Sequence, residues 1–350
     1  MKPVSYGIGA LSLIIAGTAA AQGGNWSKDQ GALIVTASNT ASNQLLIYNP
    51  AGTLLKQTPT QGQGGVSGNA GGIAQNRDRL AVVNFGSGNV SIFAKDTEHM
   101  DLRFEHLIQA IASPVSVAFG HGHLYILSTT HVESHRIDGN GVSASTDGAA
   151  ALVVADGSAA QVGTLPGQLI ISEKSNAIET VNLDSRGAVA GTATLVANIP
   201  ANVNAPFGLA TRGNDAYVTI AHANEISLVR HDDVLKVTGS GTQSAPCWVT
   251  LDGPFLFSAN SPSHSVSRYA VYGQQIIQDA AIVATFNGNP TDIEYRAGLA
   301  AVIDANGILS HVSVFGVDED GNFTLKGLAT INNAATNGVA IIRSDDRIDY

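Results

Sequence analysis

The sequence predicts an all-β protein, a seven-bladed β-propeller with four-stranded blades. Three observations predict it: a sevenfold repeat, strand patterning within each repeat, and complementary chain ends. The repeated segments resemble one another, as SPVSVAF from Ser113 resembles NPTDIE from Asn289. One marker residue per segment recurs every 40 to 47 residues, at Ala70, Pro114, Ala159, Pro206, Pro246, Pro290 and Thr336. A period of that length is typical of propeller blades, which bury their apolar faces against their neighbours.

Each repeat contains the same succession of expected strands. The marker opens a strand of small or branched residues, and a polar turn leads to a second strand such as LAVVN at Leu80–Asn84. A third strand follows, such as NVSIF from Asn89 or HVSVF from His311. Alternation with a period of two, β-branched residues and Asn, Gly or Ser turns are strand signals. No segment of core-helix length has a period of 3.6 residues, so we expect almost no helix.

The two chain ends predict how the ring closes. The last marker begins a single strand, Gly338 to Arg343, whereas the N-terminal GALIVTAS from Gly31 has no marker strand of its own. We therefore expect the C-terminal strand to be the innermost strand of the N-terminal blade. Closing the ring in this way protects sheet edges that would otherwise be open to pairing.

The first residues have the features of a secretory signal peptide: Lys2, an apolar stretch from Ile8 to Gly17, and the small residues Ala19–Ala21. A membrane anchor would need about 20 apolar residues, roughly twice the length of this stretch. We therefore expect residues 1–21 to be cleaved and residues 22–350 to form a single propeller domain. That domain is expected to be a periplasmic or secreted monomer with no membrane span.

Charge and cysteine content exclude several classes of protein. The net charge is −10, from 18 Lys and Arg against 28 Asp and Glu. Such a balance leaves no basic surface for a phosphate backbone, so we expect no nucleic-acid partner. Cys247 is the single cysteine, which excludes an intramolecular disulfide framework and a cysteine-built zinc site.

Repeats of the type LAVVNFGSGNVSIF, from Leu80, resemble the YVTN repeat, and Tyr217–Ile220 reads YVTI. The mature chain is similar to the seven-bladed lactonase-type propellers, which include 6-phosphogluconolactonase-like proteins and carboxymuconate cyclases. The resemblance implies a small-molecule site at the mouth of the central channel. Because both enzymes and binding scaffolds use this architecture, activity must be argued from the site itself.

A lactonase or ring-closing reaction is the first interpretation of that site. Inner-strand starts and second-strand ends share one rim, where His131, His222 and His264 are candidates for proton transfer. Orienting carboxylates would come from Glu173, Asp292 and Asp304, and the substrate-binding candidates are Ser116, Gln161, Phe207, Trp248 and Asn337. The resemblance implies arginines for a phosphate or several carboxylates, but no expected rim position carries Arg, and Lys174 is the nearest cation. The expected substrate is therefore a small non-phosphorylated lactone.

Two further interpretations remain open. Asn84, Glu173, Asn260 and Asp304 end the second strands of four blades, and inward-pointing oxygens would suit Ca²⁺ or another divalent cation. Asn and Asp are also ordinary turn residues. In the third interpretation the propeller is not catalytic and binds a small ligand or a secreted protein partner in the cell envelope.

Overall fold

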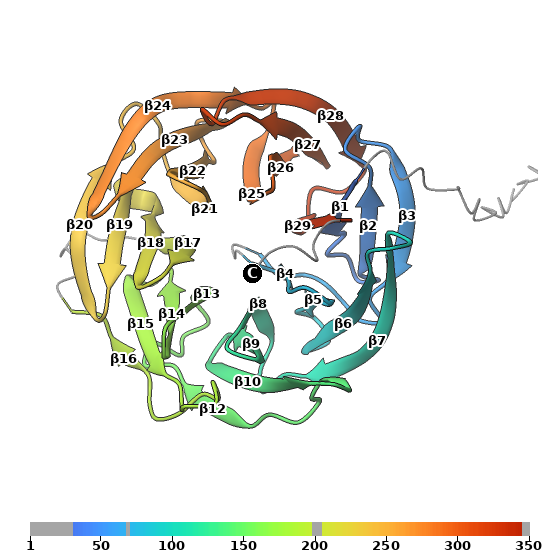
Figure 1. Ribbon diagram of the computed structural model, residues 1–350, viewed down its shortest axis with the longest axis vertical. Helices are drawn as coiled ribbons and strands as arrows, with labels where there is room; N and C mark the ends of the chain where they lie inside the picture. The colour runs from blue at the N-terminus through green and yellow to red at the C-terminus, as the bar shows by residue number, and fades with distance from the viewer. Residues whose placement is uncertain (1–30, 68–70, 198–204, 345–350) are drawn as a thin grey trace, which may run out of the picture.

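The computed structural model describes residues 31–67, 71–197 and 205–344. The expected signal peptide, residues 1–21, and the marker Ala70 lie outside the described residues. Strands dominate, and their seven antiparallel sheets stand around a central axis like the blades of a propeller (Figure 1). The predicted all-β, seven-bladed fold is confirmed.

The N-terminal blade is closed by the C-terminal strand, as expected. Its sheet order is β29-β1-β2-β3, and Ile341 of β29 pairs with Ile34 of β1. The four strands are β29 (Asn337–Arg343), β1 (Ala32–Ala37), β2 (Gln44–Tyr48) and β3 (Leu54–Pro59). We call this blade 1 and number the others along the chain.

Blades 2 to 4 occupy the lower half of Figure 1, each running outward from its innermost strand. Blade 2 contains β4 (Ile73–Gln75), β5 (Arg79–Asn84), β6 (Asn89–Asp96) and β7 (Asp101–Gln109). Blade 3 contains β8 (Pro114–Gly120), β9 (His123–Ser128) and β10 (His131–Asp138), with β11 (Gly141–Val142) and β12 (Gly148–Ala151) both paired to β10. Blade 4 contains β13 (Ala159–Leu165), β14 (Gln168–Glu173), β15 (Ala177–Asn182) and β16 (Thr194–Leu195).

Blades 5 to 7 complete the ring in the same manner. Blade 5 contains β17 (Pro206–Arg212), β18 (Asp215–Ile220), the 3₁₀ turn η2 (Ala221–Ala223), β19 (Glu225–Arg230) and β20 (Asp233–Gly239). Blade 6 contains β21 (Pro246–Asp252), β22 (Phe255–Asn260), β23 (Ser265–Tyr272) and β24 (Gln275–Thr285). Blade 7 contains β25 (Asn289–Arg296), β26 (Leu299–Asn306), β27 (Leu309–Val317) and β28 (Phe323–Ile331). Among the described residues, no helix has the length and apolar character needed to cross a bilayer.

The repeated marker is the start of a β-bulge. Pro114, Pro206 and Pro290 each pair with the end of the second strand of their own blade, and the register shifts immediately afterwards. The same shift occurs in β13, β21 and β29. Proline has no N–H to donate and is tolerated at strand starts and bulges, which explains why it recurs at this position. The bulge fixes which residues of each inner strand face the channel.

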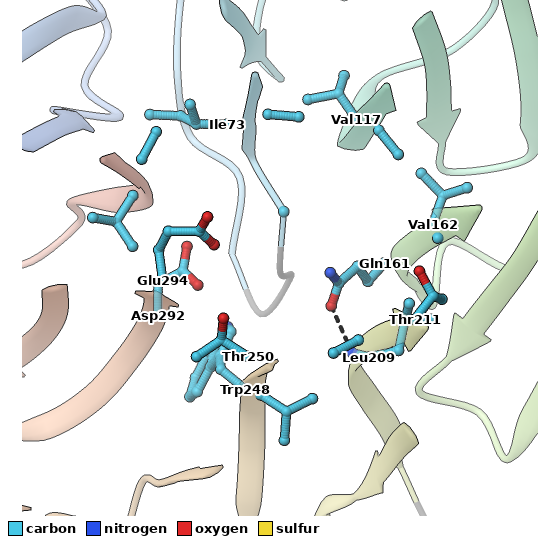
Figure 2. A pocket seen from close by; sticks show the side chains of 18 of the residues that line it. Ile73, Val117, Gln161, Val162, Leu209, Thr211, Trp248, Thr250, Asp292 and Glu294 are labelled. Atoms are coloured by element: carbon cyan, nitrogen blue, oxygen red, sulfur yellow. Dashed lines mark hydrogen bonds between the residues drawn. The ribbon is translucent and has the colours of Figure 1, made fainter. Parts of the chain in front are cut away.

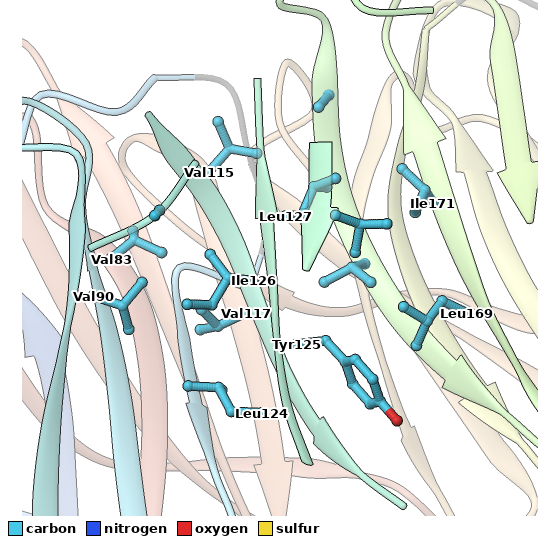
Figure 3. Packing of buried hydrophobic residues seen from close by; sticks show 14 of the residues in the cluster. Val83, Val90, Val115, Val117, Leu124, Tyr125, Ile126, Leu127, Leu169 and Ile171 are labelled. Atoms are coloured by element: carbon cyan, nitrogen blue, oxygen red, sulfur yellow. The ribbon is translucent and has the colours of Figure 1, made fainter. Parts of the chain in front are cut away.

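The core lies between the blades. One apolar cluster runs from blade 2 through blade 3 to blade 4, where Val83, Ile126 and Leu169 are all buried (Figure 3). Middle strands such as β9 are buried at every residue, because each blade is covered on both faces. Fully burying one such side chain contributes about 1.5–3 kcal/mol, so the ring is held together by its interblade contacts.

Candidate active site

The inner strands of all seven blades surround a central cavity of about 360 Å³. Its wall repeats in layers, because each inner strand places equivalent residues at the same depth. One layer is an apolar collar with one aliphatic residue per blade: Ile73, Val117, Val162, Leu209, Val249, Ile293 and Val339. Labelled collar residues surround the open centre in Figure 2.

Above the collar, the residue after the bulge in three blades bonds to the backbone of the next blade. Ser116 Oγ accepts the N–H of Val162 at 3.3 Å, and Gln161 Oε1 accepts the N–H of Leu209 at 2.7 Å. Asp292 interacts in the same way with the N–H of Val339. We call these contacts the seam. Ser116, Gln161 and Asp292 therefore each accept a hydrogen bond between neighbouring blades.

Glycine occupies the same seam position in three other blades, as Gly72, Gly208 and Gly338. At Gly208 and Gly338 the strands approach too closely for a side chain. A Cβ on Gly208 would lie 2.3 Å from the carbonyl oxygen of Cys247, and one on Gly338 would lie 2.9 Å from the nitrogen of Ile73. The seam position thus carries a polar side chain in three blades, glycine in three, and Trp248 in blade 6.

In the next layer below the collar, the residues are not equivalent in all seven blades. Five blades place a small residue there, and blades 6 and 7 place Thr250 and Glu294. The five small residues are Ala74, Ala118, Gly163, Ala210 and Ala340. Since the architecture is satisfied by alanine or glycine at this depth, Glu294 is not required by the fold.

Glu294 and Asp292 form a pair of carboxyls on one face of β25. They are two residues apart in a strand, so both side chains point to the same side, and Figure 2 shows both beside the cavity. The carboxyl of Glu294 accepts no hydrogen bond from the described residues.

Burial in the channel disfavours charge on both members of this pair. The pKa of Glu294 is raised to about 8, chiefly by withdrawal from water and also by the nearby Asp292, while Arg296 acts in the opposite direction. Burial also raises the pKa of Asp292 to about 7, against the N–H groups of Ile293 and Val339, which lower it. Two carboxyls that titrate near neutrality in a cavity are a common sign of acid–base chemistry.

Two predicted substrate-binding residues line this cavity, and three do not. Gln161 and Trp248 line the wall, and the indole of Trp248 packs edge-on against Phe207, with ring centroids 5.1 Å apart. Phe207 supports the indole from outside the cavity. Ser116 belongs to the seam, and Asn337 begins β29 opposite Ala37.

The structure does not place the three predicted histidines in the cavity. His131 begins the third strand of blade 3, where its Nδ1 lies 2.8 Å from Thr130 Oγ1. His222 lies in η2 of blade 5, and His264 lies in the turn before β23 with a φ of 51°. All three histidines follow the second strands of their blades, and the turns after those strands lie outside the ring of inner strands.

The four predicted cation ligands are buried in separate blades and do not converge. Asn84 accepts from Thr60 Oγ1 at 2.7 Å and donates to Ser91, so its amide joins blades 1 and 2. Asn260 donates to Ser267 at 2.7 Å, and Asp304 lies 3.0 Å from His311 Nδ1. Within the described ranges, no group of three or more His, Cys, Asp or Glu could hold a metal ion. These residues do not fit a central cation.

Glu173, the fourth of them, is fully buried in blade 4. One carboxyl oxygen accepts from Ser158 Oγ at 3.0 Å, and the other has no hydrogen-bond partner. Burial raises its pKa to about 8, with Glu179 and Asp156 acting in the same direction and Lys174 in the other. Glu173 is absent from the cavity wall, so its carboxyl belongs to the contact between blade 4 and the chain that precedes it.

Glu294, Thr250 and Arg296 line the cavity but are not among the site residues predicted from the sequence. A signal was present: aligning the repeats on their markers places Glu294 where other repeats have Ala118 or Ala210. The predicted histidines and cation ligands lie instead at second-strand ends or in the turns that follow, and none of them lines the cavity.

No protein-family model matches the sequence, and no curated protein matches it in sequence. Solved structures do match its fold. A provisionally assigned 6-phosphogluconolactonase from Bacteroides uniformis ATCC 8492 superposes with a TM-score of 0.65 at 14% identity, covering 90% of this chain and 100% of the other. One from Bacteroides fragilis NCTC 9343 gives 0.61 at 13% identity, covering 91% and 99%.

A streptogramin B lyase has a similar fold, with a TM-score of 0.58 at 14% identity over 79% of this chain and 91% of the other. The chain therefore shares the propeller fold of these solved structures, as its repeats predicted. Proteins with different chemistry share this architecture, so the reaction must be inferred from the cavity.

Proposed function

We propose that the protein hydrolyses a small, non-phosphorylated lactone in the central channel. The observation that carries this proposal is Glu294, a carboxyl in a layer where five blades have alanine or glycine, placed beside Asp292. The fold shared with provisionally assigned 6-phosphogluconolactonases supports it. The carboxyl pair replaces the three histidines as the proposed proton-transfer groups, because the histidines lie away from the cavity.

The charges in the cavity favour a substrate without phosphate. Arg296 is the one cation among the described lining residues, and it lies on the same strand as Asp292 and Glu294. A phosphate dianion would face two carboxyls with a single guanidinium to balance it. A neutral ring ester meets no such repulsion.

With one proton on the pair, both proton transfers of hydrolysis can be performed. The ionised carboxyl takes a proton from water as the water oxygen bonds to the lactone carbonyl carbon. The bond between the carbonyl carbon and the ring oxygen then breaks, and the ring oxygen leaves with the proton of the other carboxyl. The pair again holds one proton, and the hydroxy acid product loses its proton to solvent.

Gln161 would hold the carbonyl oxygen of the substrate. Its Oε1 is occupied by the N–H of Leu209, which leaves the side-chain NH₂ group as the donor available to a ligand. A donor fixed in this way stabilises the negative charge that develops on the carbonyl oxygen during attack.

The test measures acid release from a panel of unphosphorylated aliphatic, sugar and aromatic lactones, with and without EDTA. We expect turnover by the wild type that EDTA does not change, and a loss of about 100-fold or more in Glu294→Gln, the usual size for a general acid or base. Glu319→Gln, on the exposed β27–β28 turn, is the matched control. Binding without turnover, or full activity in Glu294→Gln, would refute the proposal.

The place of action is part of the same proposal. We expect the chain to be exported and cleaved before Gln22, giving a periplasmic or secreted protein. Intact-mass analysis of protein recovered from the exported fraction checks this, and a mass that includes residues 1–21 would contradict it.

A further inference from the structure

The cavity has one reactive side and one inert side at the depth of Glu294. Glu294 and Thr250 lie on adjacent blades, whereas the other five blades present only a methyl group or a hydrogen there. Ala74, Ala118 and Ala210 are the partly exposed members of this inert side. A ligand that contacts Glu294 therefore has methyl groups on the other side of the channel at that depth.

The charged residues also lie on one side of the cavity. Asp292, Glu294 and Arg296 are the charged residues among the described lining side chains, and all three belong to β25. No charge on the opposite blades could pair with a second ionised group of a ligand. The collar above the alanines is aliphatic as well, with Val117 and Leu209 on the same blades.

We propose that the substrate is a neutral lactone with an apolar substituent, and that Ala74, Ala118 and Ala210 determine this specificity. The ring ester lies against Glu294, and the substituent lies along the methyl side of the channel, where its apolar surface leaves water. This inference depends on the proposed lactone hydrolysis. Lower in the channel the wall is mixed, with the aromatic Phe119 beside Gln75, Thr164 and Thr211.

The experiment compares δ-valerolactone, which is a bare ring, with δ-decalactone, which carries a pentyl chain, and with the polyhydroxylated glucono-δ-lactone. We measure kcat/KM for the wild type, Ala210→Leu, Ala118→Leu and Ala149→Leu. Ala149 is exposed on β12, so its substitution is the matched control. Thermal unfolding confirms that each variant is folded, and two channel variants are used in case one is not.

We expect the wild type to prefer δ-decalactone about 10-fold or more, since even one methylene in an apolar pocket changes rates by about 10- to 200-fold. We expect Ala210→Leu and Ala118→Leu to lower kcat/KM on δ-decalactone more than on δ-valerolactone, which removes the preference, and Ala149→Leu to change neither value.

Equal rates on the two δ-lactones, a preference for glucono-δ-lactone, or an unchanged preference in both folded channel variants would overturn the inference while lactone hydrolysis stands. The absence of turnover on every lactone would overturn the proposed function together with the inference.

Discussion

The inner strands of blades 3 and 7, β8 and β25, begin alike. Each opens with a proline that pairs with the end of the second strand, and each then forms a bulge. After the bulge, Ser116 in β8 and Asp292 in β25 both interact with an N–H of the following blade. Up to this point the two strands do the same structural work.

They differ two residues later, where β8 has Ala118 and β25 has Glu294. Alanine satisfies the architecture at this depth, and the glutamate adds a carboxyl whose charge is disfavoured by burial and by Asp292. Natural proteins accept such local costs mainly where function requires them. The repeat therefore supplies an internal reference that separates what the fold needs from what the site needs.

The test with the largest expected effect gives blade 7 the alanine that blade 3 has at this depth. Glu294→Ala should lower lactone turnover by about 100- to 10,000-fold, the contribution expected of a positioned acid or base. The thermal midpoint should not fall, because the substitution removes a partly desolvated carboxyl that accepts no described hydrogen bond. Initial rates and unfolding curves measured on the same preparation check both statements.

Adding Ala118→Glu to that variant sharpens the comparison. The new carboxyl would stand beside Ser116 instead of Asp292, so it would lack the neighbouring acid that raises the pKa of Glu294. We expect no recovery of activity. Recovered activity would show that a carboxyl at this depth is sufficient for catalysis without a neighbouring acid.

The seam gives a second, smaller effect, which acts on stability. Gln161→Ala leaves the N–H of Leu209 without its 2.7 Å acceptor, and an unsatisfied buried donor costs about 1–3 kcal/mol. Asp292→Asn keeps an acceptor oxygen for the same role and should cost less. Denaturant unfolding of both variants measures the difference, and an equal loss would show that the seam is not held by these oxygens.

Much of the fold was predictable because repeats constrain it many times over. Markers such as Pro114 and Pro290 established the period, and the unmatched chain ends indicated the closing strand. The site was predicted only in part: Gln161, Trp248 and Asp292 line the cavity, but Glu294 was missed. A sequence does not show how a bulge shifts which residues face an axis. His264 and Asn84 were predicted from their place at or after second-strand ends and from their polar chemistry, and neither lines the cavity.

The pH dependence of stability tests a further difference between β25 and β8, which has no carboxyl in the channel. The pKa values of Asp292, Glu294 and Glu173 are raised to about 7, 8 and 8. The folded state thus binds more protons than the unfolded state between about pH 4 and 8. Stability is highest below the unfolded-state pKa values and falls as the pH rises through 7 and 8.

Thermal midpoints should therefore drop by several degrees between pH 5 and 8.5, at about 2–4 °C for each kcal/mol lost. Glu294→Gln should remove part of this drop, and Glu173→Gln should remove another part, because the two groups lie in different blades. A midpoint that is constant or rises with pH would contradict the raised pKa values.

The smallest effect on activity is expected at the three histidines that were predicted from the sequence to transfer protons. His131, His222 and His264 lie in blades 3, 5 and 6, and none lines the cavity. If proton transfer depends on the two carboxyls of β25, replacing all three histidines by alanine changes kcat/KM less than about twofold, as the substitutions alter surface turns and not the wall.

The pH profile supplies the stricter comparison, because a pair holding one proton gives a maximum between pH 7 and 8. The triple variant should keep that maximum, and Asp292→Asn should remove it. Loss of activity in the histidine variant, with Asp292→Asn unaffected, would return the acid–base role to the rim.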